Sequence, residues 1–309
     1  MDSVTASVIM TAFNAEKYIA EAIESILNQT FADFEFIIVD DASTDNTSLI
    51  IQRFTDSRII VIRNVQNEGV AKSSNIGLRY AKGKYIIRAD ADDINLAERF
   101  EKQIEYMEKH PKIMLSSCSM VIFGENEAER KRIIRLNEQQ IKANLIFNSV
   151  LPHPGFIFRR EVCAECGYDE TIRYALDYDF QVRASLKYPI SCMEDIYVRY
   201  RHSDTQISTQ KYKEQQEHAD VVRKRMFQYY GILLTDNELK CIQLLSTGRI
   251  KDMTSTQFLV AFKLMFELKY KVKKSRCAEK SAICDLCDEM NYKVRKEIIE
   301  RINCVLGRN

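Results

Sequence analysis

The sequence lacks any apolar run long enough to cross a membrane. A spanning helix needs about 20 consecutive apolar residues, and no window of the chain approaches that length. The segment Met1–Thr5 carries no basic residue, and the apolar stretch that begins at Val8 is too short for a signal peptide. We therefore expect no membrane span, no secretory leader and a cytoplasmic location.

The chain also lacks an excess of charge of either sign. Lys and Arg number 45 and Asp and Glu 44, a formal net charge of +1, which removes the electrostatic case for a nucleic-acid partner. Hydrophobic residues make up 46% and charged residues 29%, as in an ordinary soluble globular protein. With 309 residues, the chain is long enough for one large domain or for one domain with a helical appendage.

No disulfide framework is visible among the cysteines. Their number, nine, is odd and their spacing is irregular, which favours a reducing compartment and mostly buried thiols. Two CxxC pairs occur, Cys163 with Cys166 and Cys284 with Cys287, but they lie too far apart in the sequence to form a zinc ribbon. We therefore do not favour a zinc or redox role for them.

The first part of the chain alternates short apolar stretches with segments of helical periodicity. We expect strands at 8–10, 34–39, 59–62 and 85–89, with helices between them. Asn14 is expected to cap the first helix, and the helix before the last strand is expected to end at Gly83. This order predicts an α/β fold with a mostly parallel sheet flanked by helices.

Polar clusters follow several of these strands. They are Thr11–Asn14, Asp40–Asp41, Asn67–Lys72 and Asp90–Asp93. The carboxyl ends of parallel strands meet at one edge of a sheet, where ligands bind because helix N-termini and loop amides converge there. We therefore expect these clusters to line one crevice.

The segment Asp90-Ala-Asp-Asp93 places three carboxylates within four residues. Carboxylates this close repel one another and raise each other's pKa, so a divalent cation is their natural partner. Oxygen ligands favour Mg²⁺ or Mn²⁺. On these residues alone, a solvated acidic turn that caps the helix beginning near Leu96 is an equal alternative.

The second part of the chain changes character after about Asp204, where helical patterns take over. The segment Phe258–Leu268 is apolar almost all round, so it is expected to be buried or packed on a partner. A second copy of the chain, in a homodimer, is one such partner. The run Lys269–Arg276 holds five positive charges in eight residues. It favours either peripheral contact with the inner face of the cytoplasmic membrane or a solvated helix face.

Four ordered motifs together resemble glycosyltransferase family 2. They are Ser7–Asn14, Ile23–Thr30, Val39–Asp45 and Asn75–Asp93. The resemblance covers about residues 4–205 and implies the GT-A fold, nucleotide-sugar donors and an inverting reaction. It divides the chain into a catalytic domain at 1–205, with a donor half at 1–93 and an acceptor half at 94–205, and a C-terminal helical region at 206–309.

The resemblance implies a uridine pocket formed by Thr11, Phe13 and Asp41, with Asn14 also on the nucleotide side. The chemistry agrees, because a carboxylate can accept from the uracil imide N–H and an aromatic ring can lie on the base. Lys72 is expected to neutralise a phosphate or to support the base pocket.

The same resemblance implies a different role for each of the three carboxylates of the acidic segment. Asp90 is assigned to the ribose, Asp92 to the cation that bridges the phosphates, and Asp93 to a supporting or donor-sugar contact. His202 matches a late histidine of the family and is expected to complete the metal shell or to bind a phosphate, with a structural histidine as the alternative.

The catalytic base is expected at Asp177. The family often carries a Glu-Asp pair followed by Arg, and here Leu176 replaces the Glu, which puts the acceptor contacts near that position in doubt. Asp179 lies two positions on and, in a helix, faces away from Asp177. His153, between two prolines, is expected to shape the acceptor side.

These expectations describe a metal-assisted inverting transferase. It would move a hexose or N-acetylhexosamine from a UDP-sugar to a surface polysaccharide or lipid-linked oligosaccharide of the capsule, O-antigen or exopolysaccharide type. Two alternatives stay open. The Leu176 departure and the helical tail fit a non-catalytic scaffold subunit that binds sugar nucleotides, whereas a nucleotidyltransferase is disfavoured because Thr11–Lys17 contains no glycine for a phosphate loop.

Overall fold

A computed structural model describes residues 4–125, 127–203 and 211–305. Its contacts divide the chain into two compact units. The first consists of Met1–Asn137 and Leu151–Gln215, and the second of Glu138–Val150 and Gln216–Asn309. Residues 138–150, which were expected in the catalytic domain, pack instead with the helical unit.

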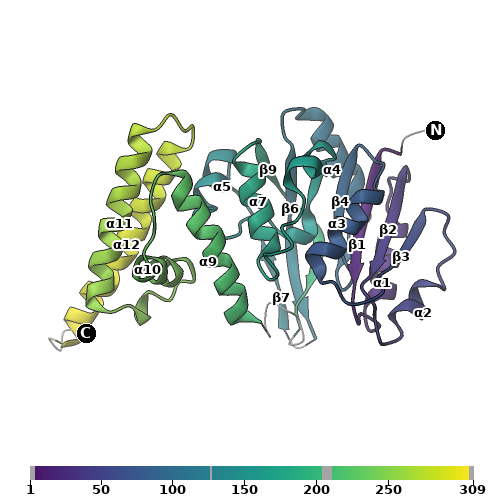
Figure 1. The fold of residues 1–309 in the computed structure, drawn as a ribbon, viewed down its shortest axis with the longest axis horizontal. Coiled ribbons are helices and arrows are strands. Elements are labelled where there is room, and N and C mark those ends of the chain that lie inside the picture. Colours follow the sequence, from purple (N-terminus) through teal and green to yellow (C-terminus); the bar gives the residue numbers. More distant parts are fainter. Residues whose placement is uncertain (1–3, 126, 204–210, 306–309) are drawn as a thin grey trace. The chain divides into compact units, whose positions relative to one another are not determined.

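The described part of the first unit contains one sheet, in the order β3-β2-β1-β4-β8-β6-β9-β5 with β7 added beside β6 (Figure 1). Neighbouring strands from β3 to β4 are parallel, as are β6 and β9, and the remaining pairs are antiparallel. The strands are β1 (Ala6–Ala12), β2 (Phe34–Asp40), β3 (Ile59–Arg63), β4 (Tyr85–Asp90), β5 (Ile94–Asn95), β6 (Leu115–Gly124), β7 (Glu127–Arg132), β8 (Ile157–Arg159) and β9 (Ile190–Arg201).

The helices of this unit connect the strands in the predicted alternating order. They are α1 (Ile19–Leu27), α2 (Thr47–Ile51), α3 (Val70–Tyr80), α4 (Arg99–Lys109), the 3₁₀ turn η1 (His153–Gly155), α6 (Glu161–Cys166) and α7 (Leu176–Ser185). The predicted α/β fold, with helices on the sheet and a helical part beyond it, is confirmed.

The two faces of the sheet are covered by different helices, because alternate residues of a strand point to opposite faces. On one face Val8 and Met10 of β1 share a core with α1, α2 and α4. On the other face α3 lies against β1 and β2. Gly77 permits this approach, because a Cβ atom there would stand 2.7 Å from Cγ2 of Ile9.

Two local predictions were wrong. Asn14 does not cap α1: the residue before the helix is Tyr18, and the side chain of Asn14 bonds elsewhere. The helix before β4 ends at Tyr80 rather than at Gly83. Gly83 has a different role, because a Cβ atom there would stand 2.5 Å from the backbone carbon of Ala6. Close approach of two chain segments, rather than a helix cap, explains this glycine.

The second unit is helical. Its elements are α5 (Glu138–Asn144), α9 (Tyr212–Tyr229), α10 (Asp236–Ser246), the 3₁₀ turn η2 (Ile250–Asp252), α11 (Ser255–Lys274) and α12 (Lys280–Val305). Residues 138–150 belong here because Nε of the buried Arg223 donates to the Phe147 carbonyl at 2.8 Å and the Phe147 and Phe227 rings pack edge to face. Helices α10 and α11 begin at capping boxes formed by Thr235 and Thr254.

The apolar segment Phe258–Leu268 is resolved as one helix with two different sides. Phe258, Leu264 and Leu268 are buried, whereas Leu259 and Phe266 are exposed. Helix α11 packs along α12 (Figure 1). Across the described residues, every helix is too short or too polar to pass through a bilayer.

Candidate active site

Strand register gathers three of the predicted nucleotide residues at one edge of the sheet. Thr11 in β1 pairs with Val39 on one side and with Asp90 on the other. Asp41 directly follows β2, and its N–H donates to the Ala12 carbonyl at 2.8 Å. The carboxyl ends of β1, β2 and β4 therefore form the common edge that the sequence predicted.

Asp41 organises the loop that leads into α3. Its carboxylate is buried and accepts hydrogen bonds from Nδ2 of Asn64 at 2.7 Å and from the N–H groups of Glu68 and Gly69 at 2.8 Å each. Gly69 has a φ of 86°, a conformation that glycine adopts without strain. Both carboxylate oxygens are thus already engaged within the protein, and the uracil contact of Asp41 stays a prediction.

Phe13 and Asn14 lie on the loop that follows β1, and Lys72 lies in the first turn of α3. Phe13 is 48% exposed, and its contact with a base stays a prediction. Asn14 has a φ of 49°, and its side-chain oxygen accepts from the Thr44 N–H at 2.8 Å, which ties the loop after β1 to the loop after β2. Nζ of Lys72 donates to Glu68 at 2.6 Å, and this bond raises the pKa of Lys72.

A buried arginine that the sequence analysis did not single out holds Asp90. Nη2 of Arg88 lies 2.5 Å from Oδ1 of Asp90 and 3.3 Å from Oγ1 of Thr11. Its Nη1 donates to the Ile9 carbonyl at 3.3 Å. Arg88 therefore connects two predicted nucleotide residues, and the visible signal was an arginine inside the apolar run of β4.

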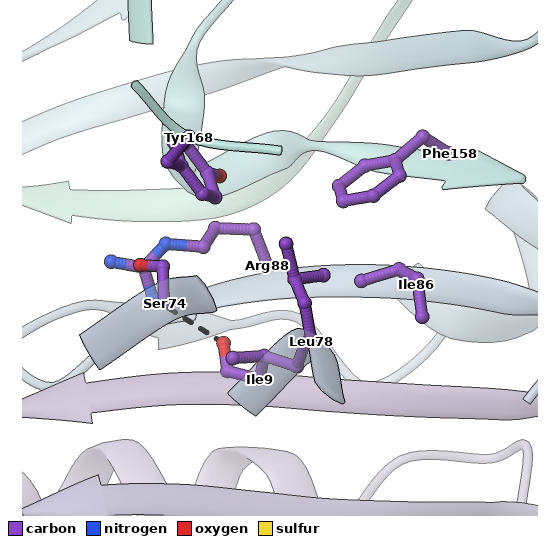
Figure 2. Close-up of a pocket in the computed structure, with 7 residues that line it drawn as sticks. All are labelled: Ile9, Ser74, Leu78, Ile86, Arg88, Phe158 and Tyr168. Carbon is purple, nitrogen blue, oxygen red and sulfur yellow. Dashed lines mark hydrogen bonds between the residues drawn. The ribbon is translucent and has the colours of Figure 1, made fainter. Parts of the chain in front are cut away.

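A small cavity lies beside this arginine (Figure 2). Its volume, about 10 Å³, is close to what one water molecule needs. Nε of Arg88 and Oγ of Ser74 are buried without a hydrogen-bond partner among the described residues, and both residues line the cavity. The other lining residues are Ile9, Leu78, Ile86, Phe158 and Tyr168.

The acidic turn after β4 is tied to the end of β9. Oδ1 of the buried Asp93 accepts from the Arg201 N–H at 2.7 Å, and Nε of Arg201 donates to the Asp92 carbonyl at 2.8 Å. The Arg201 guanidinium lies over the rings of Tyr18 and Phe123, with distances of 4.2 and 4.6 Å to the ring centroids. Arg201 is a second arginine that the sequence analysis did not identify.

His202 follows Arg201 directly, and its N–H donates to the Phe123 carbonyl at 2.7 Å. The structure thus brings a residue from the far end of the domain to the neighbourhood of the acidic turn. Its predicted contact with a metal or phosphate stays a prediction.

The acidic turn supplies carboxylate oxygens, the ligand type that a hard cation takes. Burial, together with the charges of Asp92 and Asp90, raises the pKa of Asp93 well above its ordinary value. Oδ2 of Asp93 is a buried oxygen without a hydrogen-bond partner among the described residues. Across these residues no three His, Cys, Asp or Glu side chains gather as ligands. Mg²⁺ needs only one or two carboxylates when substrate phosphates supply the rest, so the residues fit such an ion.

The two carboxylates at the start of α7 differ in their surroundings. Asp179 is fully buried, and its Oδ2 accepts from Nε of Arg183 at 2.6 Å. Arg183 also donates to the Gly167 carbonyl at 2.7 Å, so this pair fixes the loop before α7. Asp177 is half-buried. The difference agrees with the expectation that the two side chains face apart, whereas the catalytic role of Asp177 and the substrate contact of Asp179 stay predictions.

His153 begins the 3₁₀ turn η1 that precedes β8. Its Nε2 is 2.8 Å from Oη of Tyr168, and its ring packs edge to face on Phe156. Burial lowers the pKa of His153 to about 4; Arg88 adds to the shift, and the negative charges of Asp90 and Asp177 oppose it. His153 is therefore neutral at neutral pH. Tyr168 is the third residue of this region that the sequence analysis did not identify.

The family model described as Glycosyl transferase family 2 matches residues 7–167, the part that contains the edge of the sheet and the acidic turn. A curated relative, "Uncharacterized glycosyltransferase MJ1057" of Methanocaldococcus jannaschii, is 36% identical over 208 residues, which cover 65% of this chain and 72% of the relative.

A second relative has a more specific name. It is the Escherichia coli UDP-Glc:alpha-D-GlcNAc-diphosphoundecaprenol beta-1,3-glucosyltransferase WfgD, 30% identical over 232 residues, which cover 72% of this chain and 87% of WfgD. Among solved structures, S. aureus TarS 1-349 in complex with UDP-GlcNAc superposes with a TM-score of 0.63 at 18% identity, covering 94% of this chain and 92% of that one. This likeness confirms the GT-A type of fold.

Proposed function

Because the chain belongs to glycosyltransferase family 2, we propose that it transfers a hexose or N-acetylhexosamine from a UDP-sugar to a sugar hydroxyl of a surface polysaccharide or lipid-linked oligosaccharide. The membership confirms the resemblance drawn from the motifs, and the protein is an enzyme of the transferase class. The observation that carries the proposal is the strand register that sets Thr11 beside Asp90 and brings Asp41 to the same edge.

The donor would bind along this edge. The exposed Phe13 ring offers a face to the uracil, Thr11 and Asp41 lie at the imide side, and Asp90 accepts from the ribose hydroxyls. Lys72, beside the loop that Asp41 orders, would neutralise a phosphate. The name of WfgD includes a UDP-sugar donor and a diphosphoundecaprenol acceptor, which supports both substrate classes by analogy.

A divalent cation would be held by Asp92, with His202 completing its shell. When bound, it supplies positive charge that stabilises the departing diphosphate. A mannosyltransferase from Pyrobaculum calidifontis, solved with GDP-Man and Mn²⁺, has a related fold with a TM-score of 0.52 at 13% identity, which supports the choice of ion by analogy only.

Asp177 would act as the base on the acceptor side. It accepts the proton of the acceptor hydroxyl while the hydroxyl oxygen attacks the anomeric carbon, and the bond from that carbon to the UDP oxygen breaks with its electron pair. One in-line displacement inverts the anomeric configuration, as in inverting glycosidases with water replaced by a sugar hydroxyl. His153 is neutral at neutral pH because burial lowers its pKa to about 4. It would form a hydrogen bond with the acceptor sugar without adding a charge to the site.

The direct test is release of UDP from a panel of UDP-sugars, with GDP-mannose as the non-uridine control. We expect one UDP-sugar to be hydrolysed slowly in the presence of Mn²⁺, and faster transfer when a lipid-linked oligosaccharide extract is added. Asp92→Ala should abolish this activity. Glu105→Ala, which removes a half-exposed carboxylate of α4, is the matched control and should stay active.

Three outcomes would contradict parts of the proposal. UDP binding without release, with every donor and extract, would favour the scaffold alternative that Leu176 motivates. Turnover of GDP-mannose alone would reject the uridine pocket. Release that is unchanged by EDTA would reject the cation at Asp92.

A further inference from the structure

Helix α11 has an exposed apolar stripe. Leu259, Phe266 and Tyr270 are exposed by 71%, 72% and 49%. Their spacings of seven and four residues place them on one face of the helix. The opposite face is buried within the unit, where Leu264, Leu268 and other side chains form part of the core. The helix therefore carries apolar residues on both sides, and only one of these sides is buried within the unit.

The exposed side of α11 is basic as well as apolar. Its exposed residues are Ser255, Thr256, Leu259, Lys263, Phe266, Tyr270, Lys271, Lys273 and Lys274. These include four lysines and no acid, and the one acidic residue of the helix, Glu267, is half-buried on the flank. Lysines and large apolar side chains thus share one surface, which we call the α11 stripe.

The salt bridge of α11 to α12 lies outside the α11 stripe. Among the described residues, no salt bridge involves Lys263, Lys271 or Lys273. Lys269, which is not part of the stripe, behaves differently: its Nζ lies 2.6 Å from Oδ1 of Asp288 on α12. The charge of the stripe therefore faces outward, whereas the lysine on the packed side has a carboxylate partner.

We propose that the α11 stripe docks the protein on an anionic membrane surface. An interfacial helix buries an apolar face among lipid headgroups while lysines contact anionic lipid, and this combination distinguishes it from an ordinary solvated helix. The aromatic rings of Phe266 and Tyr270 suit the boundary between water and acyl chains. Lys263 and Lys273 stand on the same face as these rings, where they would reach the phosphates.

A second copy of the chain fits this surface less well. A two-fold interface brings the same patch of both subunits together, so the lysines of one copy would face those of the other. Such like-charge contacts cost free energy, whereas anionic lipid neutralises them. The inference stands on α11 alone and does not depend on the donor or acceptor proposed above, so membrane binding and transferase activity can fail separately.

The absence of tryptophan from the chain permits a local test. Phe266→Trp introduces the only indole, and its emission should shift to the blue when vesicles containing phosphatidylglycerol are added to the full-length protein. Vesicles of phosphatidylcholine alone should cause little shift. Leu233→Trp, at an apolar residue that is 81% exposed in the same unit but outside α11, is the matched control and should not shift.

Charge reversal tests the lysines. Lys263→Glu with Lys273→Glu should weaken binding to the anionic vesicles by more than tenfold in cosedimentation, since each lysine near such a surface contributes about fivefold. Leu259→Glu with Phe266→Glu should do the same, whereas Leu233→Glu should bind as the unmodified protein does. Unchanged circular dichroism and thermal midpoint establish that each variant is folded.

Two results would overturn the proposal. Equal binding to neutral and anionic vesicles would remove the preference for anionic lipid on which the proposal rests. No blue shift of Phe266→Trp with either vesicle would remove the membrane as the partner. A blue shift without lipid that grows with protein concentration, accompanied by a doubled mass in light scattering, would assign the α11 stripe to a second copy of the chain.

Discussion

Nη2 of Arg88 lies 2.5 Å from Oδ1 of Asp90, so the first carboxylate of the acidic turn is held by an arginine that is itself buried. A buried guanidinium is costly unless it is paired and hydrogen-bonded, and Asp90, Thr11 and the Ile9 carbonyl supply these contacts. The arrangement fixes the direction of Asp90 before any donor arrives. It also offsets part of the negative charge that would oppose an incoming diphosphate.

Arg88→Met tests this relationship. The substitution fills the buried position with an apolar side chain but leaves Asp90 without its cation, so we expect the dissociation constant of UDP to rise about tenfold. Isothermal titration calorimetry measures the change. Arg135→Met breaks a surface pair whose side chains are 75% and 65% exposed, and it should leave UDP binding unchanged. Equal affinity of Arg88→Met and the unmodified protein would show that Asp90 needs no such support.

Asp177→Asn should lower turnover, whereas Asp179→Asn should lower stability. Asp177→Asn removes the proposed base and should lower turnover by roughly 10²- to 10⁴-fold with UDP affinity retained. Asp179→Asn breaks the buried pair with Arg183, and it should lower the free energy of unfolding by on the order of 2 kcal/mol. Single-turnover kinetics and urea unfolding measure the two effects. A fully active Asp177→Asn would move the base to another residue.

The edge of the sheet could be predicted from the sequence because it follows from local rules. Parallel strands end together, so residues such as Thr11, Asp41 and Asp90 meet whatever the details of packing. Arg88 and Arg201 could not be assigned in this way. Asp90 is close to Arg88 in sequence, but both arginines also contact positions that are distant in sequence, such as Arg88 with Thr11 across 77 positions and Arg201 with Asp93 across 108.

The role of Gly83 also depends on a contact between residues that are distant in sequence. The sequence placed a helix end there, whereas the structure shows a crossing of two chain segments, with the Gly83 N–H donating to Oγ of Ser7 at 2.8 Å. Backbone approach between distant residues leaves no periodic signal in the sequence. The carboxyl-end rule therefore predicted where the site lies, and tertiary contacts decided which side chains support it.

Gly83→Ala should destabilise the first unit. The added Cβ atom would stand 2.5 Å from the backbone of Ala6 and Ser7, so strand β1 or the turn before β4 must shift. We expect a loss of about 3 kcal/mol in the free energy of unfolding by urea. Gly167→Ala is the matched control, because its nearest new neighbour is 3.4 Å away. A stable Gly83→Ala would mean that the two segments separate at little cost.

His153 gives the protein a pH dependence with a definite sign. Burial lowers the pKa of His153 from 6.5 to about 4, so between these values the unfolded chain binds the proton that the folded chain refuses. Stability should therefore be complete above about pH 6.5 and fall as the pH is lowered toward 4. Because the side chain is only half-buried, we expect this contribution to be on the order of 1 kcal/mol.

His153→Gln isolates this contribution. Glutamine cannot titrate but can still bond to Oη of Tyr168, so the free energy of unfolding of the variant should fall less steeply between pH 6.5 and 4 than that of the unmodified protein. Urea unfolding at several pH values measures the slope. His110→Gln removes an exposed histidine at the end of α4 and controls for the loss of a histidine as such. Parallel curves for His153→Gln and the unmodified protein would mean that folding leaves the pKa of His153 unchanged, against the effect of burial.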